Sequence, residues 1–237
     1  MAGTVISEIC IVCDDNAVLN EIMDKYTTNG GLDFNKICPM PEDLKDVPSL
    51  STWVVKGISR YLSIINPNNK AYEGHHLRQK YKMVSKEEMA YILEDLKRYG
   101  DTGLSSLLQP CLSPQEAEGE PLETSPNFEQ FINAGMGYVW NTRNFSVPNA
   151  DLWMERFWGT RTNAKTISKC EIIDNTLRTR IETSEEPRRV IAVLEGKYPT
   201  CKILFHFMGM SDASRYMDAA YDAGIFVYDK DYPKYNN

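Results

Sequence analysis

The chain has 237 residues, 42% of them hydrophobic, and carries a formal net charge of −7 at pH 7. Its size excludes a small disulfide framework for the six cysteines, and its acidic charge disfavours wholesale binding to a nucleic acid backbone. No apolar run approaches the roughly 20 residues that span a bilayer, and residues 1–8 show no signal peptide. We therefore expect a cytoplasmic protein with reduced cysteines and no membrane partner.

The first forty residues predict a strand followed by a helix. Residues 4–13 are β-branched and mostly apolar, which is typical of a buried strand, and residues 14–16 stop it and offer a helix N-cap. Residues 17–26 carry apolar side chains at helical spacing. Residues 32–41 predict an extended apolar segment, which its two prolines keep out of a central place in a sheet.

From residue 42 to about residue 150 the pattern changes to helices and loops. A capping box, Ser85-Lys-Glu-Glu, opens one of these helices. Residues 110–126 contain four prolines and four glutamates, so we expect a solvated loop there. The predicted helices are residues 51–65, 85–99, 104–108 and 128–140.

The stretch Asp-Leu-Trp-Met-Glu-Arg-Phe-Trp-Gly-Thr-Arg-Thr-Asn, which begins at Asp151, marks the change from helices to strands. Asp151 is expected to cap a helix, and Gly159 fits the end of that helix, where a left-handed residue satisfies free carbonyl groups. Trp158 is then either a buried residue at a helix-to-strand corner or, with Arg161 and Asn163, part of a recognition surface.

After this stretch, strands alternate with one helix. A turn at Asp174 and Asn175 separates two strands, and Glu185-Glu186-Pro187 opens the helix with acidic residues at its positive dipole end and proline in its first turn. A further short helix and an edge strand follow. The predicted strands are residues 164–173, 176–182, 201–207 and 225–228, and the additional helix is residues 211–223.

With the middle of the chain set aside, the order of elements is β-α-β-β-α-β, the split β-α-β order. We predict an α+β fold, namely a ferredoxin-like antiparallel sheet with two helices on one face plus a large, mostly helical insertion. The core comprises residues 1–41 and 158–210, the insertion residues 42–157, and a C-terminal extension residues 211–237.

Two segments resemble the motifs of a known family. The first, Leu-Asp-Phe-Asn-Lys-Ile-Cys-Pro-Met-Pro, begins at Leu32, and the second, Trp-Gly-Thr-Arg-Thr-Asn-Ala, begins at Trp158. Together and in this order they resemble the YubB ferredoxin-like domain family of plasmids, phages and genomic islands. Thr162 stands where that family has a second tryptophan. The resemblance implies a fold and a mobile-element setting, but neither an established reaction nor an iron–sulfur centre.

The cysteines and histidines predict no metal or cofactor. Cys10 and Cys13 lie three apart on one predicted strand, so their side chains point to opposite faces, and the other cysteines add no second pair at ligand spacing. His75 and His76 are the best local candidates for acid–base or metal chemistry. We interpret them as a surface pair, because adjacent side chains rarely converge without a tight loop. The sequence contains neither a nucleophile elbow nor a phosphate-binding glycine loop.

A cluster of basic residues accompanies the predicted hairpin. Arg178 and Arg180 share one face of a strand, and with Trp158 nearby they could bind a single nucleic acid strand by phosphate contact and stacking. The alternative is a solvated outer face of the sheet. The candidate binding residues are Trp158, Arg161, Asn163, Arg178 and Arg180, and we predict no catalytic residue.

We therefore expect a non-enzymatic protein-interaction module of a mobile genetic element, either phage or plasmid. Its partner would be an unidentified host or element-encoded protein, and inhibition of a bacterial defence system such as CRISPR–Cas is one such role. The alternative function is nucleic acid binding through the open sheet face. A third interpretation, which we favour less, is an enzyme that uses His75, His76 or Glu186.

Overall fold

The structure is a computed structural model that describes residues 4–104, 107–108, 112–114 and 121–209. It contains a four-stranded antiparallel sheet and several helices, so the fold is α+β. The chain divides into two compact units, residues 1–40 with 154–237 and residues 41–153, which we call the sheet unit and the helical unit. No helix within the described part of the chain is long and apolar enough to cross a membrane. The elements predicted after residue 210 lie outside the described residues.

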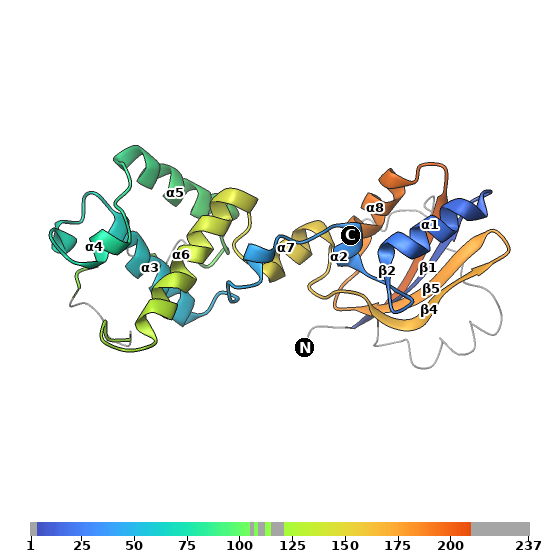
Figure 1. The fold of residues 1–237 in the computed structure, drawn as a ribbon, viewed down its shortest axis with the longest axis horizontal. Coiled ribbons are helices and arrows are strands. Elements are labelled where there is room, and N and C mark those ends of the chain that lie inside the picture. Colours follow the sequence, from blue (N-terminus) through green and yellow to red (C-terminus); the bar gives the residue numbers. More distant parts are fainter. Residues whose placement is uncertain (1–3, 105–106, 109–111, 115–120, 210–237) are drawn as a thin grey trace. The chain divides into compact units, whose positions relative to one another are not determined.

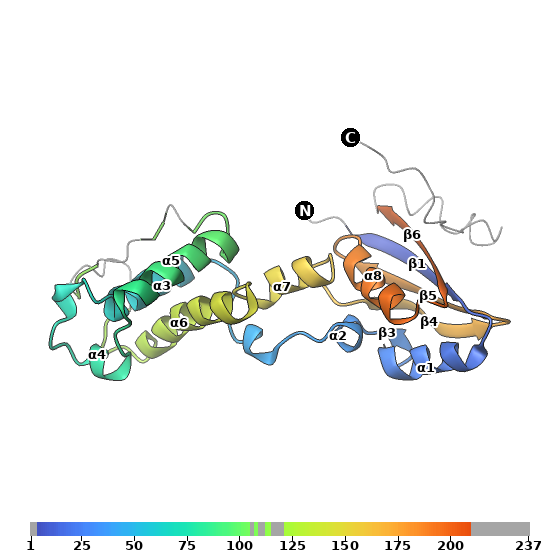
Figure 2. The same cartoon turned by 90° about the horizontal axis from the view of Figure 1, so that it is seen from above.

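The sheet has the strand order β4-β5-β1-β6, and every neighbouring pair in it is antiparallel (Figures 1 and 2). Strand β1 (Val5–Val12) therefore lies between β5 (Thr176–Thr183) and β6 (Lys202–Gly209), and β4 (Lys165–Ile173) follows β5. Asp174, which has a left-handed backbone, lies in the turn from β4 to β5. The four strands predicted up to residue 209 are thus present.

Helices α1 (Asn16–Tyr26) and α8 (Arg188–Lys197) lie on the same face of the sheet (Figures 1 and 2). Successive side chains of a strand point to opposite faces, so alternate residues of β1 and β5 form the buried layer. Each fully buried aliphatic side chain contributes roughly 1.5–3 kcal/mol of transfer free energy. The fully buried aliphatic residues in this layer are Ile9, Ile11, Leu19, Ile22, Leu177, Ile181, Val190 and Leu194.

The two helices of the sheet unit begin differently. The Asp15 side chain caps α1 as predicted, because it accepts a hydrogen bond from the Ala17 N–H at 2.8 Å. The prediction for α8 was wrong in detail, since Pro187 occupies the N-cap position and the first turn contains no acidic residue. Glu185 precedes the helix, and its carboxylate accepts a hydrogen bond from the backbone N–H of Arg161.

The prediction of an extended segment at residues 32–41 was also wrong. A small hairpin, β2 (Thr27–Thr28) with β3 (Gly31–Leu32), leads directly into a one-turn helix, α2 (Phe34–Ile37). Asp33 accounts for the difference, because its side chain accepts a hydrogen bond from the Asn35 N–H at 3.0 Å and so caps this turn. The two prolines follow only after the helix has ended.

Three long helices build the helical unit: α3 (Thr52–Ile65), α5 (Lys86–Tyr99) and α6 (Phe128–Phe145). Ser51 and Ser85 cap α3 and α5 through their side chains. Two short helices, η1 (Glu42–Leu44) and η2 (Lys70–Tyr72), and the one-turn α4 (Leu77–Lys80) complete the described elements. Leu104, where a further helix was predicted, lies in a turn, and residues 105–106 lie outside the described residues.

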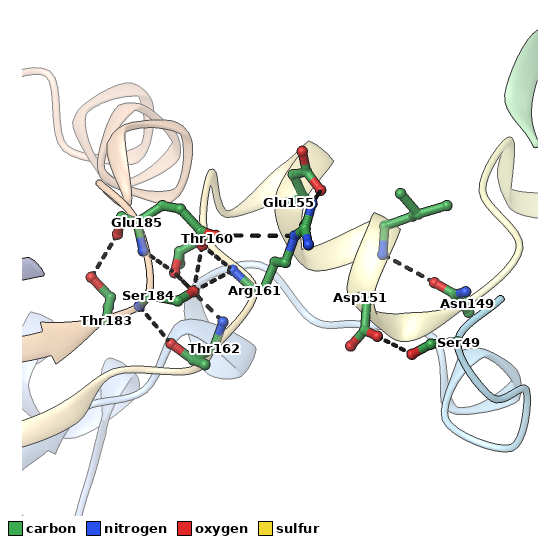
Figure 3. Close-up of polar contacts among 11 residues, drawn as sticks. Ser49, Asn149, Asp151, Glu155, Thr160, Arg161, Thr162, Thr183, Ser184 and Glu185 are labelled. Carbon is green, nitrogen blue, oxygen red and sulfur yellow. Dashed lines mark hydrogen bonds and ion pairs between the residues drawn. The ribbon is translucent and has the colours of Figure 1, made fainter. Parts of the chain in front are cut away.

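Helix α7 (Ala150–Phe157) begins one residue before Asp151, which was predicted to be its N-cap. Asn149 supplies the cap, because its side-chain oxygen accepts a hydrogen bond from the Leu152 N–H at 3.0 Å. Asp151 lies instead in the first turn, where its carboxylate accepts a hydrogen bond from Ser49 (Figure 3). Gly159 follows the helix with φ +83° and donates its N–H to the Met154 carbonyl, as predicted.

Candidate functional site

Trp158 lies in the core of the sheet unit, where it is only 2% exposed. Its ring packs edge-on against Phe34, with ring centroids 5.9 Å apart, and its indole N–H donates a hydrogen bond to the Cys38 carbonyl at 2.9 Å. An indole in this position cannot stack on a nucleobase or on a partner protein while the unit remains folded. Trp158 therefore holds the helix-to-strand corner.

Asn163 also serves the fold, although it lies at the surface. Its side-chain oxygen accepts hydrogen bonds from the N–H groups of Phe34 and Ala164, at 2.9 and 2.8 Å. Its side-chain nitrogen donates to Asp33 at 2.9 Å. Burial acts to raise the pKa of the Asp33 carboxyl, but the hydrogen bonds from Asn163, Thr28 and the Asn35 N–H outweigh it and hold that pKa below its usual value.

Arg161 is exposed, but two glutamates hold it at the corner (Figure 3). Its side chain forms an ion pair with Glu155 at 2.9 Å, and its backbone N–H donates to Glu185 at 2.8 Å. Burial acts to raise the pKa of Glu185, whereas hydrogen bonds from Ser184, the Arg161 N–H and Thr160 together keep it below its usual value. The charge of Arg161 is thus largely compensated within the corner.

Arg178 and Arg180 lie on the same face of β5, as predicted, and this face points away from α1 and α8. Acidic residues share it. Arg180 lies opposite Glu8 in β1, and Arg178 lies opposite Glu171 in β4. At the end of the same row, Lys165 and Glu182 form an ion pair at 3.2 Å. The described part of this face therefore alternates in charge instead of forming a positive track for phosphates.

The structure does not bring the five candidate residues into one site. Two of them stabilise the α2 region, one is paired at the corner, and two lie on the mixed sheet face.

A groove of about 620 Å³ in the helical unit is a better candidate for contact with a partner. Two tryptophans line it, Trp53 with 36% and Trp140 with 60% of its surface exposed. Its lining includes three carboxylates and no lysine, arginine or histidine. The lining residues are Asp43, Asp46, Val47, Pro48, Trp53, Pro126, Glu129, Gln130, Asn133, Ala134, Gly137, Trp140 and Asn141.

One face of α6 forms the floor of this groove, since seven of the lining residues recur along that helix at helical spacing. The Trp53 ring packs edge-on against Phe131 of α6, with centroids 5.4 Å apart. The buried Asn141 donates its side-chain N–H to the Asp43 carbonyl at 3.0 Å, which fixes η1 beside the helix. The walls of the groove are therefore held by specific contacts.

The carboxylates of the groove differ in their surroundings. Glu129 forms an ion pair with Lys80 at 2.6 Å, whereas Asp43 and Asp46 form no ion pair with any residue that the structure describes. The groove was not predicted, because Trp53 belongs to the apolar stripe of the predicted helix at residues 51–65, and such a stripe is typically buried. The signal that could have revealed it was Trp140, which lies outside the buried stripe of α6.

His75 and His76 lie close to Glu123, a residue that sequence reasoning did not connect with them. Both histidine Nε2 atoms lie 3.6 Å from the same carboxylate oxygen of Glu123. This is the one group of three potential metal ligands found among the described residues. Glu186, the other residue considered for acid–base chemistry, is paired instead with Arg188 at 2.5 Å.

Comparison with known proteins gives no match to a family model, a curated protein or a solved structure.

Proposed function

We propose that this chain is a non-enzymatic protein-interaction module of a mobile genetic element, with a ferredoxin-like core, a helical insertion and membership of the YubB family. The order β4-β5-β1-β6 with antiparallel neighbours is consistent with such a core. The two motifs that carry the family resemblance also contact each other, since Trp158 packs on Phe34. These observations support the proposed family, and the mobile-element setting rests on the motifs alone.

The acidic, tryptophan-lined groove of the helical unit carries the interaction part of the proposal. Exposed tryptophan supplies a large apolar contact surface and attracts cations through its ring face. Asp43 and Asp46 add negative charge that is not compensated locally by the described residues. Such a surface fits a basic segment with apolar side chains, because complementary charge steers association and apolar burial stabilises it.

Proteins that bind nucleic acid present basic surfaces, and the effectors of a defence system such as CRISPR–Cas are proteins of this kind. We propose that the groove engages a surface of this kind. Nucleic acid binding through the sheet face is the weaker alternative, because Glu8, Glu171 and Glu182 share that face with the arginines.

The test is capture of proteins from a bacterial lysate by the tagged full chain, with and without nuclease. An exposed aromatic residue at the centre of an interface contributes about 2 kcal/mol or more, so Trp140→Ala should weaken retention by roughly 30-fold or more. Asp43→Asn with Asp46→Asn should weaken it at low salt, and the difference from the wild type should shrink at high salt.

Tyr91→Ala is the matched control, because Tyr91 is 64% exposed in the same unit and does not line the groove. It should retain the captured protein. Loss of capture after nuclease treatment, or capture that is insensitive to Trp140→Ala, would favour the sheet face or another surface and overturn the proposal.

A further inference from the structure

The cluster of His75, His76 and Glu123 has a geometry that neither the fold nor the proposed interaction explains. Each histidine Nε2 lies 3.6 Å from Glu123 Oε2, and the three ligand atoms lie within 4.8 Å of one another. The two imidazole rings lie side by side, with centroids 4.5 Å apart and planes tilted by 31°. Two adjacent side chains therefore converge on a single carboxylate from a distant segment.

A tight turn produces this convergence. Gly74, directly before the pair, adopts φ +74°, a left-handed conformation that other residues rarely take. The N–H of His75 donates to the Tyr72 carbonyl at 3.0 Å, and the His75 ring packs edge-on against the fully buried Tyr72 ring. The Tyr72 hydroxyl is in turn hydrogen-bonded to the buried Arg60. The His75 side chain is thus positioned by the core.

We propose that His75, His76 and Glu123 form a binding site for a first-row divalent transition-metal ion, with zinc as the representative. Ligand atoms at 2.0–2.2 Å from a tetrahedral zinc ion lie about 3.4 Å from one another, close to the 3.6 Å found here between nitrogen and oxygen. Two imidazoles and a carboxylate are ligands that zinc accepts, whereas calcium and magnesium prefer sites made of oxygen atoms.

Three protein ligands leave a fourth position of a tetrahedral ion to water. His76 is 68% exposed on its side chain, so this position is open to solvent. One contact opposes the metal: the Leu77 N–H points at His75 Nδ1 and favours the tautomer that carries its proton on Nε2. A metal bound at His75 Nε2 requires the tautomer with its proton on Nδ1, which gives up this contact; at 3.4 Å the contact is longer than the usual range for an N–H donor and contributes little.

The experiment is zinc titration of chelator-treated full chain by isothermal calorimetry, with metal content measured after dialysis. We expect one zinc per chain, and the visible absorption of tetrahedral cobalt when cobalt(II) replaces zinc. His76→Ala and Glu123→Gln should each weaken zinc binding by about tenfold or more, since each removes a direct ligand. His75→Ala should do the same.

Glu94→Gln is the control, because it removes an exposed glutamate of α5 that is not part of the cluster. It should leave zinc binding unchanged. His76→Ala and Glu123→Gln change exposed or partly exposed side chains, so they should leave the fold intact. They therefore test zinc binding even if His75→Ala disturbs the fold. Absence of stoichiometric zinc, or zinc retained equally by these two variants, overturns the proposal and leaves a metal-free contact between the histidines and Glu123.

Discussion

The indole N–H of Trp158 donates a hydrogen bond to the carbonyl oxygen of Cys38 at 2.9 Å, across 120 residues of sequence. This bond joins the corner after α7 to the chain segment that follows α2. The Trp158 ring also covers Phe34, the first residue of α2. One side chain thus connects two segments of the sheet unit that are far apart in the sequence.

Truncation of this side chain should destabilise the protein strongly. Trp158→Ala removes a ring that is only 2% exposed and leaves the Cys38 carbonyl without its donor, so we expect a loss of roughly 3–5 kcal/mol in the free energy of unfolding. Trp158→Phe keeps most of the packing and should lose less. Thermal melts of the full chain measure both.

Arg161→Ala is the matched comparison from the same corner. Its ion pair with Glu155 is exposed, and such pairs contribute at most about 1 kcal/mol. The melting temperature should therefore change little. If Trp158→Ala melts like the wild type while Arg161→Ala unfolds, the assignment of Trp158 to the core is wrong.

The elements with strong local signals were predictable from sequence. Strand β1 and the hairpin of β4 and β5 follow from alternating or continuous apolar patterns, and α5 follows from the Ser85 capping box. The helix α2 was missed because its signal is one capping residue, Asp33, beside two prolines that argue for an extended chain. A single cap determined the local structure there.

The stability of the helix-to-strand corner at Trp158 should depend on pH through Glu185. Its pKa is lowered in the folded protein, so its contribution to stability is present above the unfolded pKa of about 4.3 and is lost as pH falls through the folded value. The wild type should be more stable than Glu185→Gln at pH 7, by less than about 1 kcal/mol, because 42% of the Glu185 side chain is exposed and solvent screens its interactions. That margin should shrink below about pH 4. A margin that grows with acid would contradict the assigned hydrogen bonds.

The close approach of α3 and α6 gives a prediction for the helical unit. A Cβ atom added at Gly135 would lie 2.2 Å from the backbone of Gly57, so Gly135→Ala must push the two helices apart. Overpacking of this kind costs about 1–3 kcal/mol and occasionally more. Gly196→Ala, in α8, meets open space and should instead stabilise the chain by up to about 1 kcal/mol. Equal effects of the two substitutions in denaturant unfolding would show that the helices do not meet here.

Neither candidate site was predicted as a whole from the sequence, and the reason is the same for both. The groove combines η1 with one face of α6, and the histidine cluster combines the turn at Gly74 with Glu123 from a proline-rich segment. Contacts between distant segments leave no periodic signal. Arg178 and Arg180 were placed correctly on one face because that relationship depends only on alternation within a strand.

Cys13 and Cys201 should form a disulfide under mild oxidation. The register of β1 and β6 ends with Val12 opposite Lys202, so the next opposed pair is Cys13 and Cys201. The Cys13 N–H donates to the Asn175 carbonyl, on the β5 side of β1. Cys13 and Cys201 therefore form a non-hydrogen-bonded pair between β1 and β6. Such pairs have Cα atoms about 4.5 Å apart, within the range of about 4.4–6.8 Å that disulfides require.

The reaction should be slow at neutral pH. Burial, then the hydrogen bond and the charge interaction with Cys13, raise the pKa of Cys201 to about 11, and the thiolate is the reactive form. Oxidation by diamide takes two electrons and two protons from the thiol pair, and its rate should increase as pH rises toward that value. Peptide mapping should find the disulfide in the wild type and in Cys38→Ser but not in Cys201→Ser. A disulfide that joins either cysteine to another position would contradict the register of β1 and β6.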